Sequence, residues 1–181
     1  LASPDERKKH IDFVKEWLDI SARLGSPCLR VFVGPAPKGQ SEDEALQWAA
    51  AGLKECADHA EKLGIMIGVE NHGGLTATAE GLVRVLKAVS SDWVGALLDF
   101  GNYSKDPYAE FELTAPYTVM THAKPTADFA GTRGWVDYRR VADIMRKAGY
   151  RGFLSIEYEE PGQDAMIEVP RFAAYLRGIT G

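Results

Sequence analysis

The sequence is poor in cysteine. Of its 181 residues only Cys28 and Cys56 are cysteines, and their spacing matches neither a zinc motif nor a disulfide framework. We therefore expect both to be small buried residues of a reduced compartment, which favours a cytoplasmic location. The sequence does not begin with methionine, so an export signal upstream of it stays open.

An excess of basic charge and long apolar runs are also lacking. The net charge is −5 at pH 7, whereas a nucleic-acid-binding domain normally carries a basic patch or stripe. No apolar stretch reaches the roughly 18 residues that span a bilayer. We therefore predict neither a nucleic-acid nor a membrane partner. Hydrophobic residues at 45% and charged residues at 26% indicate an ordinary globular protein of one domain.

Helical and strand patterns alternate along the whole chain. Near-continuous apolar segments predict strands at 28–33, 65–70, 94–99, 117–122 and 153–157. Amphipathic segments with caps predict helices at 4–24, 41–64, 78–89, 108–113, 138–148 and 164–177. Apolar strands separated by amphipathic helices are typical of a parallel sheet covered by helices, so the fold class is α/β.

Ionisable side chains gather where four consecutive strands end. The groups are Glu70 and His72, Asp99 before Gly101, His122 and Lys124, and Glu157 and Glu159. Residues two apart on a strand share a face, so the members of each pair can point the same way. Parallel α/β folds place their sites at the carboxyl ends of the strands. We therefore expect these groups to line one site.

Three carboxylates and one imidazole at one rim predict a bound cation. Without a cation, charge repulsion between these groups and their desolvation would cost several kcal/mol. A single acid after a strand is usually a helix cap or a solvated charge, but four in register are not explained in that way. Glu70, Asp99, His122 and Glu157 are thus predicted to hold one divalent ion. Mn²⁺, Mg²⁺ or Co²⁺ suits these ligands, and Zn²⁺ is also compatible with them.

Five segments together resemble the xylose isomerase-like TIM-barrel superfamily. They are Leu-Arg-Val-Phe-Val-Gly at 29–34, Gly-Val-Glu-Asn-His at 68–72, Leu-Asp-Phe-Gly-Asn at 98–102, Thr-His-Ala-Lys at 121–124 and Gly-Phe-Leu-Ser-Ile-Glu at 152–157. The superfamily includes sugar isomerases and epimerases, hydroxypyruvate isomerase, inosose dehydratase and the endonuclease IV type of nuclease. The order and spacing of the segments carry the resemblance along essentially the whole chain.

The resemblance implies a partial (β/α)₈ TIM barrel. About five parallel strands with flanking helices would correspond to strands 4–8 of the family fold, in a single domain at 1–181 that lacks the first three βα units. The two sheet edges would then be unpaired, which is an aggregation hazard. We expect either a truncated longer protein or a homo-oligomer, for instance a strand-exchanged dimer.

The resemblance also implies roles for individual residues. Glu70, Asp99, His122 and Glu157 match the four metal ligands of the family, and the two glutamates match its acid/base pair. His72 and Lys124 fall where residues that contact the substrate are expected. Asn102 stands where epimerases of this group usually have a histidine, and Pro125 stands where an aspartate is frequent. Both departures concern the substrate more than the metal.

Three further residues are substrate-binding candidates. Arg30 would be an anchor if it faces the barrel interior, and the alternative is an ion pair with a neighbouring acid at the rim. Arg133 could close over a substrate, or it could be a solvated loop residue. Trp135 lies in the segment beyond His122 and could stack on a sugar ring. Asp137, by contrast, is interpreted as a helix cap.

The resulting functional prediction is a metal-dependent isomerase or epimerase. It would act on a small sugar, sugar phosphate or hydroxy-carbonyl compound by proton transfer through an enediolate, with Glu70 and Glu157 carrying the proton. One alternative is a metal-dependent dehydratase of the inosose dehydratase kind, and another is a non-catalytic barrel fragment that binds a metal or a polyol. Phosphodiester cleavage of the endonuclease IV type needs three metals and more histidines than the four present.

Overall fold

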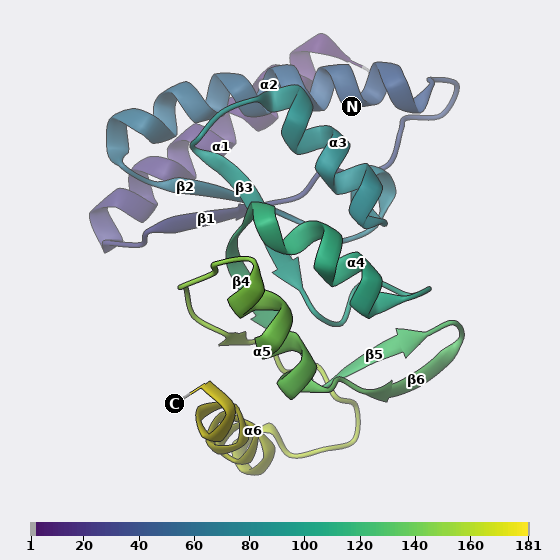
Figure 1. The fold of residues 1–181 in the computed structure, drawn as a ribbon. Helices are drawn as coiled ribbons and strands as arrows, with labels where there is room; N and C mark the ends of the chain where they lie inside the picture. The colour runs from purple at the N-terminus through teal and green to yellow at the C-terminus, as the bar shows by residue number, and fades with distance from the viewer. Residues whose placement is uncertain (1–2, 181) are drawn as a thin grey trace.

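The structure is a computed structural model that describes residues 3–180. It contains a curved parallel sheet with helices along the outside of the curve (Figure 1). The helices and strands are α1 (Pro4–Leu24), β1 (Cys28–Val31), α2 (Glu42–Leu63), β2 (Met66–Glu70), η1 (Gly74–Thr76), α3 (Ala79–Val89), β3 (Val94–Asp99), α4 (Pro107–Thr114), η2 (Ala115–Tyr117), β4 (Thr118–Ala123), β5 (Thr126–Phe129), β6 (Thr132–Trp135), α5 (Tyr138–Lys147), β7 (Ser155–Ile156) and α6 (Ala165–Thr180).

The five parallel strands follow one another in the sheet as they do along the chain. Their order is β1-β2-β3-β4-β7, and every neighbouring pair is parallel. Each crossover includes a helix, which is the βα arrangement that the alternating pattern predicts. The prediction of an α/β fold that forms part of a TIM barrel is therefore confirmed. The last strand is shorter than predicted, since only Ser155 and Ile156 pair with β4.

Two buried clusters hold the helices against the sheet. The first packs β1, β2 and β3 beneath α1, α2 and α3, with Ile67, Val69 and Leu82 fully buried. The second cluster is aromatic and packs β3 and β4 against α4, α5 and α6. In it, the ring of Phe100 meets the rings of Phe111 and Tyr138 edge to face, at centroid distances of 5.1 and 5.8 Å. This aromatic packing lies directly behind the carboxyl ends of β3 and β4.

A small hairpin follows β4 and was not predicted. Strands β5 and β6 are antiparallel, in a segment that the sequence pattern indicated as a loop. The two turn residues, Ala130 and Gly131, both have positive φ angles of 54° and 91°, as the tightest hairpin turns require. Glu160, beyond β7, accepts hydrogen bonds from Thr126 at 2.7 Å and from Arg133 at 3.1 Å. The hairpin is thereby tied to the segment that follows β7.

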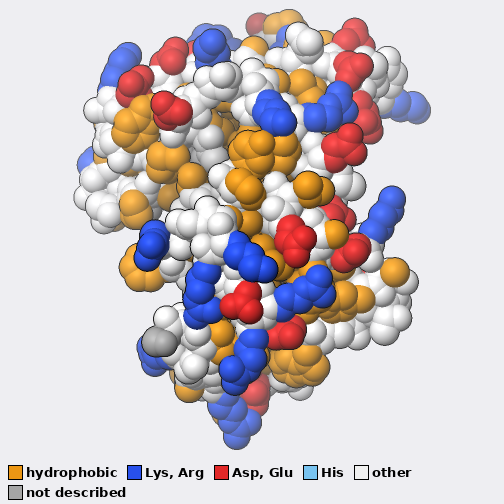
Figure 2. All heavy atoms as spheres, in the orientation of Figure 1, with side chains coloured by type: hydrophobic (Ala, Val, Ile, Leu, Met, Phe, Trp, Pro, Cys, Tyr) orange, Lys and Arg blue, Asp and Glu red, His pale blue; other side chains and the backbone are white. Residues whose placement is uncertain are grey.

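Charges of both signs are mixed on the surface. Figure 2 shows acidic and basic side chains interspersed over the lower part of the displayed face. Among the helices of residues 3–180, none has the length and apolar character that a membrane crossing requires.

Candidate metal centre

The four predicted ligand residues meet at the carboxyl edge of the sheet. Glu70 and Asp99 are the last residues of β2 and β3, His122 is near the end of β4, and Glu157 follows β7 directly. Asp99 is level with His122 in the register of β3 and β4. The N–H of Glu157 donates to the carbonyl of Ala123 at 3.1 Å, which continues the pairing of β4 with β7. Parallel pairing alone therefore brings four distant segments to one point.

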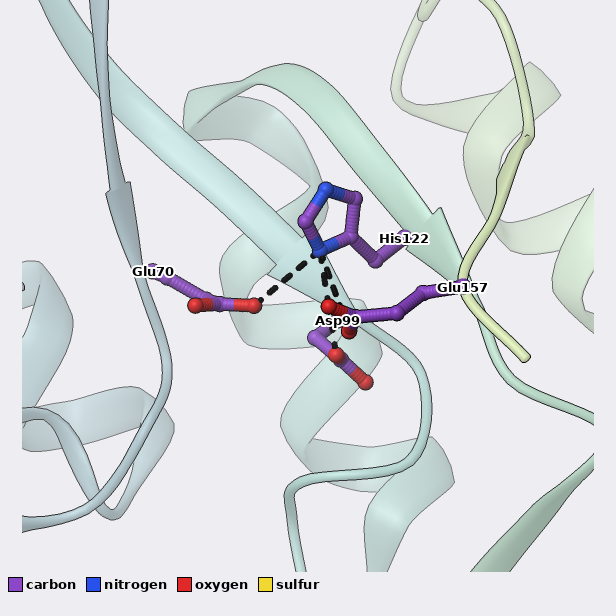
Figure 3. Close-up of side chains that lie close together, drawn as sticks. All are labelled: Glu70, Asp99, His122 and Glu157. Carbon is purple, nitrogen blue, oxygen red and sulfur yellow. Dashed lines mark hydrogen bonds and ion pairs between the residues drawn. The ribbon is translucent and has the colours of Figure 1, made fainter. Parts of the chain in front are cut away.

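Their side chains point at one another (Figure 3). His122 Nδ1 lies 3.1 Å from Glu70 Oε1, 3.3 Å from Glu157 Oε2 and 4.0 Å from Asp99 Oδ2. One donor atom from each of the four residues lies within 4.8 Å of all the others. A six-coordinate ion with bonds of about 2.1 Å separates its ligands by about 3.0 Å at right angles and about 4.2 Å across the ion. The three distances from His122 Nδ1, 3.1 to 4.0 Å, lie within this range.

Two oxygen atoms in the cluster lack a hydrogen bond although they are buried. Glu70 and Asp99 are fully buried, and Glu70 Oε2 and Asp99 Oδ2 have no hydrogen-bond partner. Arg30 Nε lies 2.8 Å from the first atom and Lys124 Nζ 3.2 Å from the second, so these contacts are ion pairs without hydrogen-bond alignment. Buried carboxylate oxygens normally have a partner. Glu70 Oε2 is held by Arg30, whereas Asp99 Oδ2 lies 4.0 Å from His122 Nδ1 and faces the centre of the cluster. The residues present thus fit a divalent cation, which Asp99 Oδ2 would bind.

Lys124 and Arg30 are the cationic neighbours of the cluster. Lys124 Nζ lies 2.7 Å from Glu159 Oε2, 3.3 Å from Glu157 Oε2 and 3.2 Å from Asn102 Oδ1. Arg30 reaches from β1 to Glu70 and, through Nη1 at 3.2 Å, to Glu157 Oε1. Of the two interpretations of Arg30, the structure shows the pairing with acids at the rim.

The environment shifts the pKa values of the cluster in opposite directions. Burial raises the pKa of Asp99 to about 7, against the opposing effects of the Gly101 N–H and the Lys124 charge. Burial also acts to raise the pKa of Glu157, but the neighbouring Asp99 carboxyl group and the charges of Lys124 and His122 outweigh it and lower the pKa. The hydrogen bond to Glu70 raises the pKa of His122. Near neutral pH these shifts favour an ionised Glu157 and a positively charged His122, whereas Asp99 is the carboxyl group that takes up a proton most readily.

Several residues that position the cluster were not predicted. Asn71 is buried and binds the backbone of Asp99, and the Gly101 N–H donates to Asp99 Oδ1 at 2.6 Å. The hydroxyl of Thr76, also buried, donates to the Glu70 carbonyl at 2.8 Å. A signal for Asn71 was present, because an amide directly after a buried strand is suited to bind a neighbouring strand end.

The predicted substrate-binding residues divide into two groups. Arg30, Lys124 and Asn102 lie at the cluster. His72 is exposed and packs on the Phe32 ring at a centroid distance of 4.5 Å.

Arg133 and Trp135 make their contacts elsewhere. Arg133 pairs with Glu160. Trp135 is 70% exposed and borders a cavity of about 370 Å³ against α6, which Phe172 and Tyr175 also line. None of the four predicted ligands lines that cavity.

A parallel β/α sheet that forms part of a barrel, with a carboxylate and imidazole cluster at its carboxyl edge, defines an α/β protein with a candidate metal centre. The sequence model of one such family, the xylose isomerase-like TIM barrel, matches residues 1–177, and the chain belongs to this family.

Comparisons with individual proteins agree with this assignment. The chain is 27% identical over 168 residues to Uncharacterized protein MJ1311 of Methanocaldococcus jannaschii, covering 83% of this chain but only 57% of that protein. Solved structures of similar fold include a D-tagatose 3-epimerase-like protein, with a TM-score of 0.80 at 23% identity, over 98% of this chain and 73% of that one.

Two further structures were determined with bound metals. The IOLI protein with a zinc atom has a TM-score of 0.82 at 18% identity, covering 99% of this chain and 72% of that one. A xylose isomerase-like TIM barrel protein from Mycobacterium smegmatis in complex with magnesium has a TM-score of 0.77 at 22% identity, covering 98% and 69%. At these identities the likeness shows a shared fold.

Proposed function

We propose that this chain carries the catalytic centre of a divalent-metal-dependent sugar isomerase or epimerase. The observation that carries the proposal is the convergence of four donor atoms within 4.8 Å of one another. One of the four residues, Asp99, has a buried oxygen, Oδ2, without a hydrogen bond. Family membership supports it, as do the epimerase and metal-bound neighbours. The proposed substrate class is a small ketose or a related hydroxy-carbonyl compound.

Glu70, Asp99, His122 and Glu157 would hold the ion. When bound, a divalent ion supplies a Lewis acid that polarises a carbonyl and acidifies the neighbouring C–H group. Glu70 and Glu157 flank His122 Nδ1 at 3.1 and 3.3 Å. In the proposed reaction one of these carboxylates removes the proton from the carbon beside the carbonyl. The other returns a proton to a second carbon or to the opposite face.

Lys124 and Asn102 would bind substrate oxygens. Burial acts to lower the pKa of Lys124, but the hydrogen bond from its ammonium group to Glu159 and the charges of Asp99 and Glu157 outweigh it and raise the pKa. Lys124 therefore stays protonated and can donate to a developing oxyanion rather than accept a proton. Asn102 Nδ2 is buried and has no hydrogen-bond partner, so it is a free donor for a hydroxyl or carbonyl oxygen.

Proton exchange tests the proposal. The chelator-treated protein would be incubated in D₂O with a panel of ketoses, with and without Mn²⁺, and exchange at carbon would be followed by NMR. We expect exchange that needs the ion and that Glu70→Gln and Glu157→Gln both abolish. Exchange at full rate in the metal-free protein would refute the scheme. Release of water from a polyol ketone, without exchange into the recovered substrate, would indicate the dehydratase alternative instead.

We further propose that the chain is a homo-oligomer. Within residues 3–180, β1 and β7 each pair with a single strand, and Phe32 and Phe153 beside them are 53% and 85% exposed. Unpaired strand edges with exposed aromatic residues favour association. Sedimentation over a range of concentrations should show species larger than a monomer, and Phe153→Glu should reduce them. A monomer at every concentration would contradict the proposal.

A further inference from the structure

Arg30 contacts one carboxylate oxygen of Glu70 and one of Glu157, the two proposed proton carriers. Its Nε lies 2.8 Å from Glu70 Oε2, and its Nη1 lies 3.2 Å from Glu157 Oε1. The remaining oxygens, Glu70 Oε1 and Glu157 Oε2, are the ones that lie 3.1 and 3.3 Å from His122 Nδ1. One oxygen of each glutamate thus faces the arginine, and the other faces the centre of the cluster.

The position and the chemistry of Arg30 allow it to contact both glutamates at once. It lies on β1 in register with Gly68 of β2. A guanidinium presents several N–H donors in one rigid plane, so a single group can hold carboxylates from two different strands. The ammonium of a lysine is a point charge on a flexible chain and lacks that planar geometry.

The arginine is itself held in place. Its Cζ lies 4.5 Å from the centre of the Phe32 ring, which packs in turn on His72. A guanidinium that stacks on an aromatic face while its nitrogens bind carboxylates has little freedom to rotate. Its side chain is 35% exposed and Glu70 is fully buried, so Arg30 approaches the cluster from the solvent side.

From this geometry we propose that Arg30 is a positioning residue that restricts Glu70 and Glu157 to one metal-binding oxygen each. The inference rests on the proposed metal centre. With one donor atom from each of the four residues, the protein would supply four ligands to the ion. Further ligands would then have to come from oxygens of a substrate or from water.

The same restriction selects the ion. Ca²⁺ takes about 6–8 oxygen ligands and readily accepts bidentate carboxylates, whereas Mg²⁺ demands near-ideal octahedral geometry. Without Arg30 both glutamates are free to turn and bind through both oxygens. The centre would then supply those further ligands from protein oxygens and favour the larger ion.

Ion selectivity is therefore the measurement that tests the inference. Dissociation constants for Mn²⁺ and Ca²⁺ would be measured by calorimetry on the wild type, Arg30→Met, Arg30→Gln and Arg30→Lys. Arg84→Met is the matched control, because Arg84 pairs with Asp43 on the surface between α2 and α3. Water-proton relaxation would count the water molecules on bound Mn²⁺ in each protein.

We expect the wild type to prefer Mn²⁺, and Arg30→Met and Arg30→Gln to shift the ratio of the two constants towards Ca²⁺ by about 10- to 100-fold. Bound Mn²⁺ should lose water in these variants, Arg30→Lys should restore the ratio only in part, and Arg84→Met should match the wild type. An unchanged ratio and water count in folded Arg30→Met or Arg30→Gln would overturn the role of Arg30. Failure of the wild type to bind either ion would instead overturn the proposed metal centre.

Discussion

The side chain of Asn71 makes its hydrogen bonds to the backbone of one residue, Asp99. Its Nδ2 donates to the Asp99 carbonyl at 2.9 Å, and its Oδ1 accepts from the Asp99 N–H at 2.7 Å. Asn71 is 1% exposed and directly follows Glu70. The amide therefore joins the end of β2 to the end of β3, which are the two strands that place the buried carboxylates.

Asn71→Ala should weaken both the fold and the centre. The substitution leaves a buried N–H and a buried carbonyl of Asp99 without partners, so we expect the free energy of unfolding to fall by about 1–3 kcal/mol. Mn²⁺ affinity should fall with it, because Asp99 loses its fixed position. Urea unfolding and calorimetry measure the two effects. Asn102→Ala is the comparison, since it loses only the hydrogen bond that Oδ1 accepts from Lys124 and its Nδ2 has no partner to lose. An equal loss of stability there would contradict the argument.

Lys124→Met should destabilise the metal-free protein more than the metal-bound one. Lys124 is largely buried among Asp99, Glu157 and Glu159, and removal of one partner from such a group costs up to about 3 kcal/mol. A bound ion supplies the missing positive charge, so saturating Mn²⁺ should narrow the difference from the wild type.

By linkage, Lys124→Met should then bind Mn²⁺ more tightly than the wild type. Unfolding with and without the ion measures the difference, and Lys8→Met is the control because its pair with Asp12 is exposed. If the difference in unfolding free energy between Lys124→Met and the wild type stays constant as Mn²⁺ is added, the ion does not replace the charge of Lys124.

Removal of the metal should lower stability in the wild type but not in Asp99→Asn. At an ion concentration 100 times the dissociation constant, binding adds about 2.7 kcal/mol to the free energy of unfolding. Asp99→Asn keeps the shape of the side chain but loses the charge that binds the cation, so the gain should largely disappear. Thermal unfolding with Mn²⁺ and with EDTA measures it. Asp143→Asn, in a surface pair with Arg146, should keep the full gain.

Ser41→Ala should lower stability in a pH-dependent manner. The hydroxyl of Ser41 caps α2, and its loss should cost about 1 kcal/mol at neutral pH. Hydrogen bonds from the Ser41 N–H and hydroxyl hold the pKa of Glu44 below its ordinary value of 4.5. The contribution of Glu44 is therefore fully present above pH 4.5 and is lost as the pH falls through the lowered pKa.

The wild type and Ser41→Ala should consequently approach each other in stability as the pH falls below 4.5, the ordinary pKa of Glu44. Urea unfolding across this range measures the change. Thr78→Ala is the matched control, because Thr78 caps α3 through its hydroxyl without a reciprocal carboxylate. The difference between Thr78→Ala and the wild type should not narrow in this way, and a parallel narrowing would contradict the role of Glu44.

The parallel sheet could be predicted from the sequence because its strands are apolar and end at marked positions. Val94–Asp99 is buried along its whole length, and its predicted bounds match those observed. The hairpin at β5 and β6 was missed because its strands are only four residues long and half of their residues are polar. Its signal was the pair Ala130 and Gly131, and an alanine at positive φ is uncommon enough to hide a turn.

The convergence of the candidate site could be predicted, but its supporting contacts could not. Glu70, Asp99, His122 and Glu157 each lie at or next to the carboxyl end of a strand, so parallel pairing alone brings them to one edge. The contacts of Arg30 and Asn71 depend on rotamers and on the distance between strand ends, which a sequence pattern does not contain. The roles of the four residues as ligands stay predictions for the metal titrations above.

The hydrogen bonds of Glu160 help to position Glu157, which follows the two-residue strand β7. Strand β7 shares only two paired positions with β4, yet Glu160, three residues beyond Glu157, is anchored by Thr126 and Arg133 of the hairpin. The segment that carries Glu157 is thus fastened at both ends, by the sheet before it and by the hairpin after it. Substitutions in the β5–β6 hairpin would therefore change the position of the Glu157 side chain without altering the buried core of the parallel sheet.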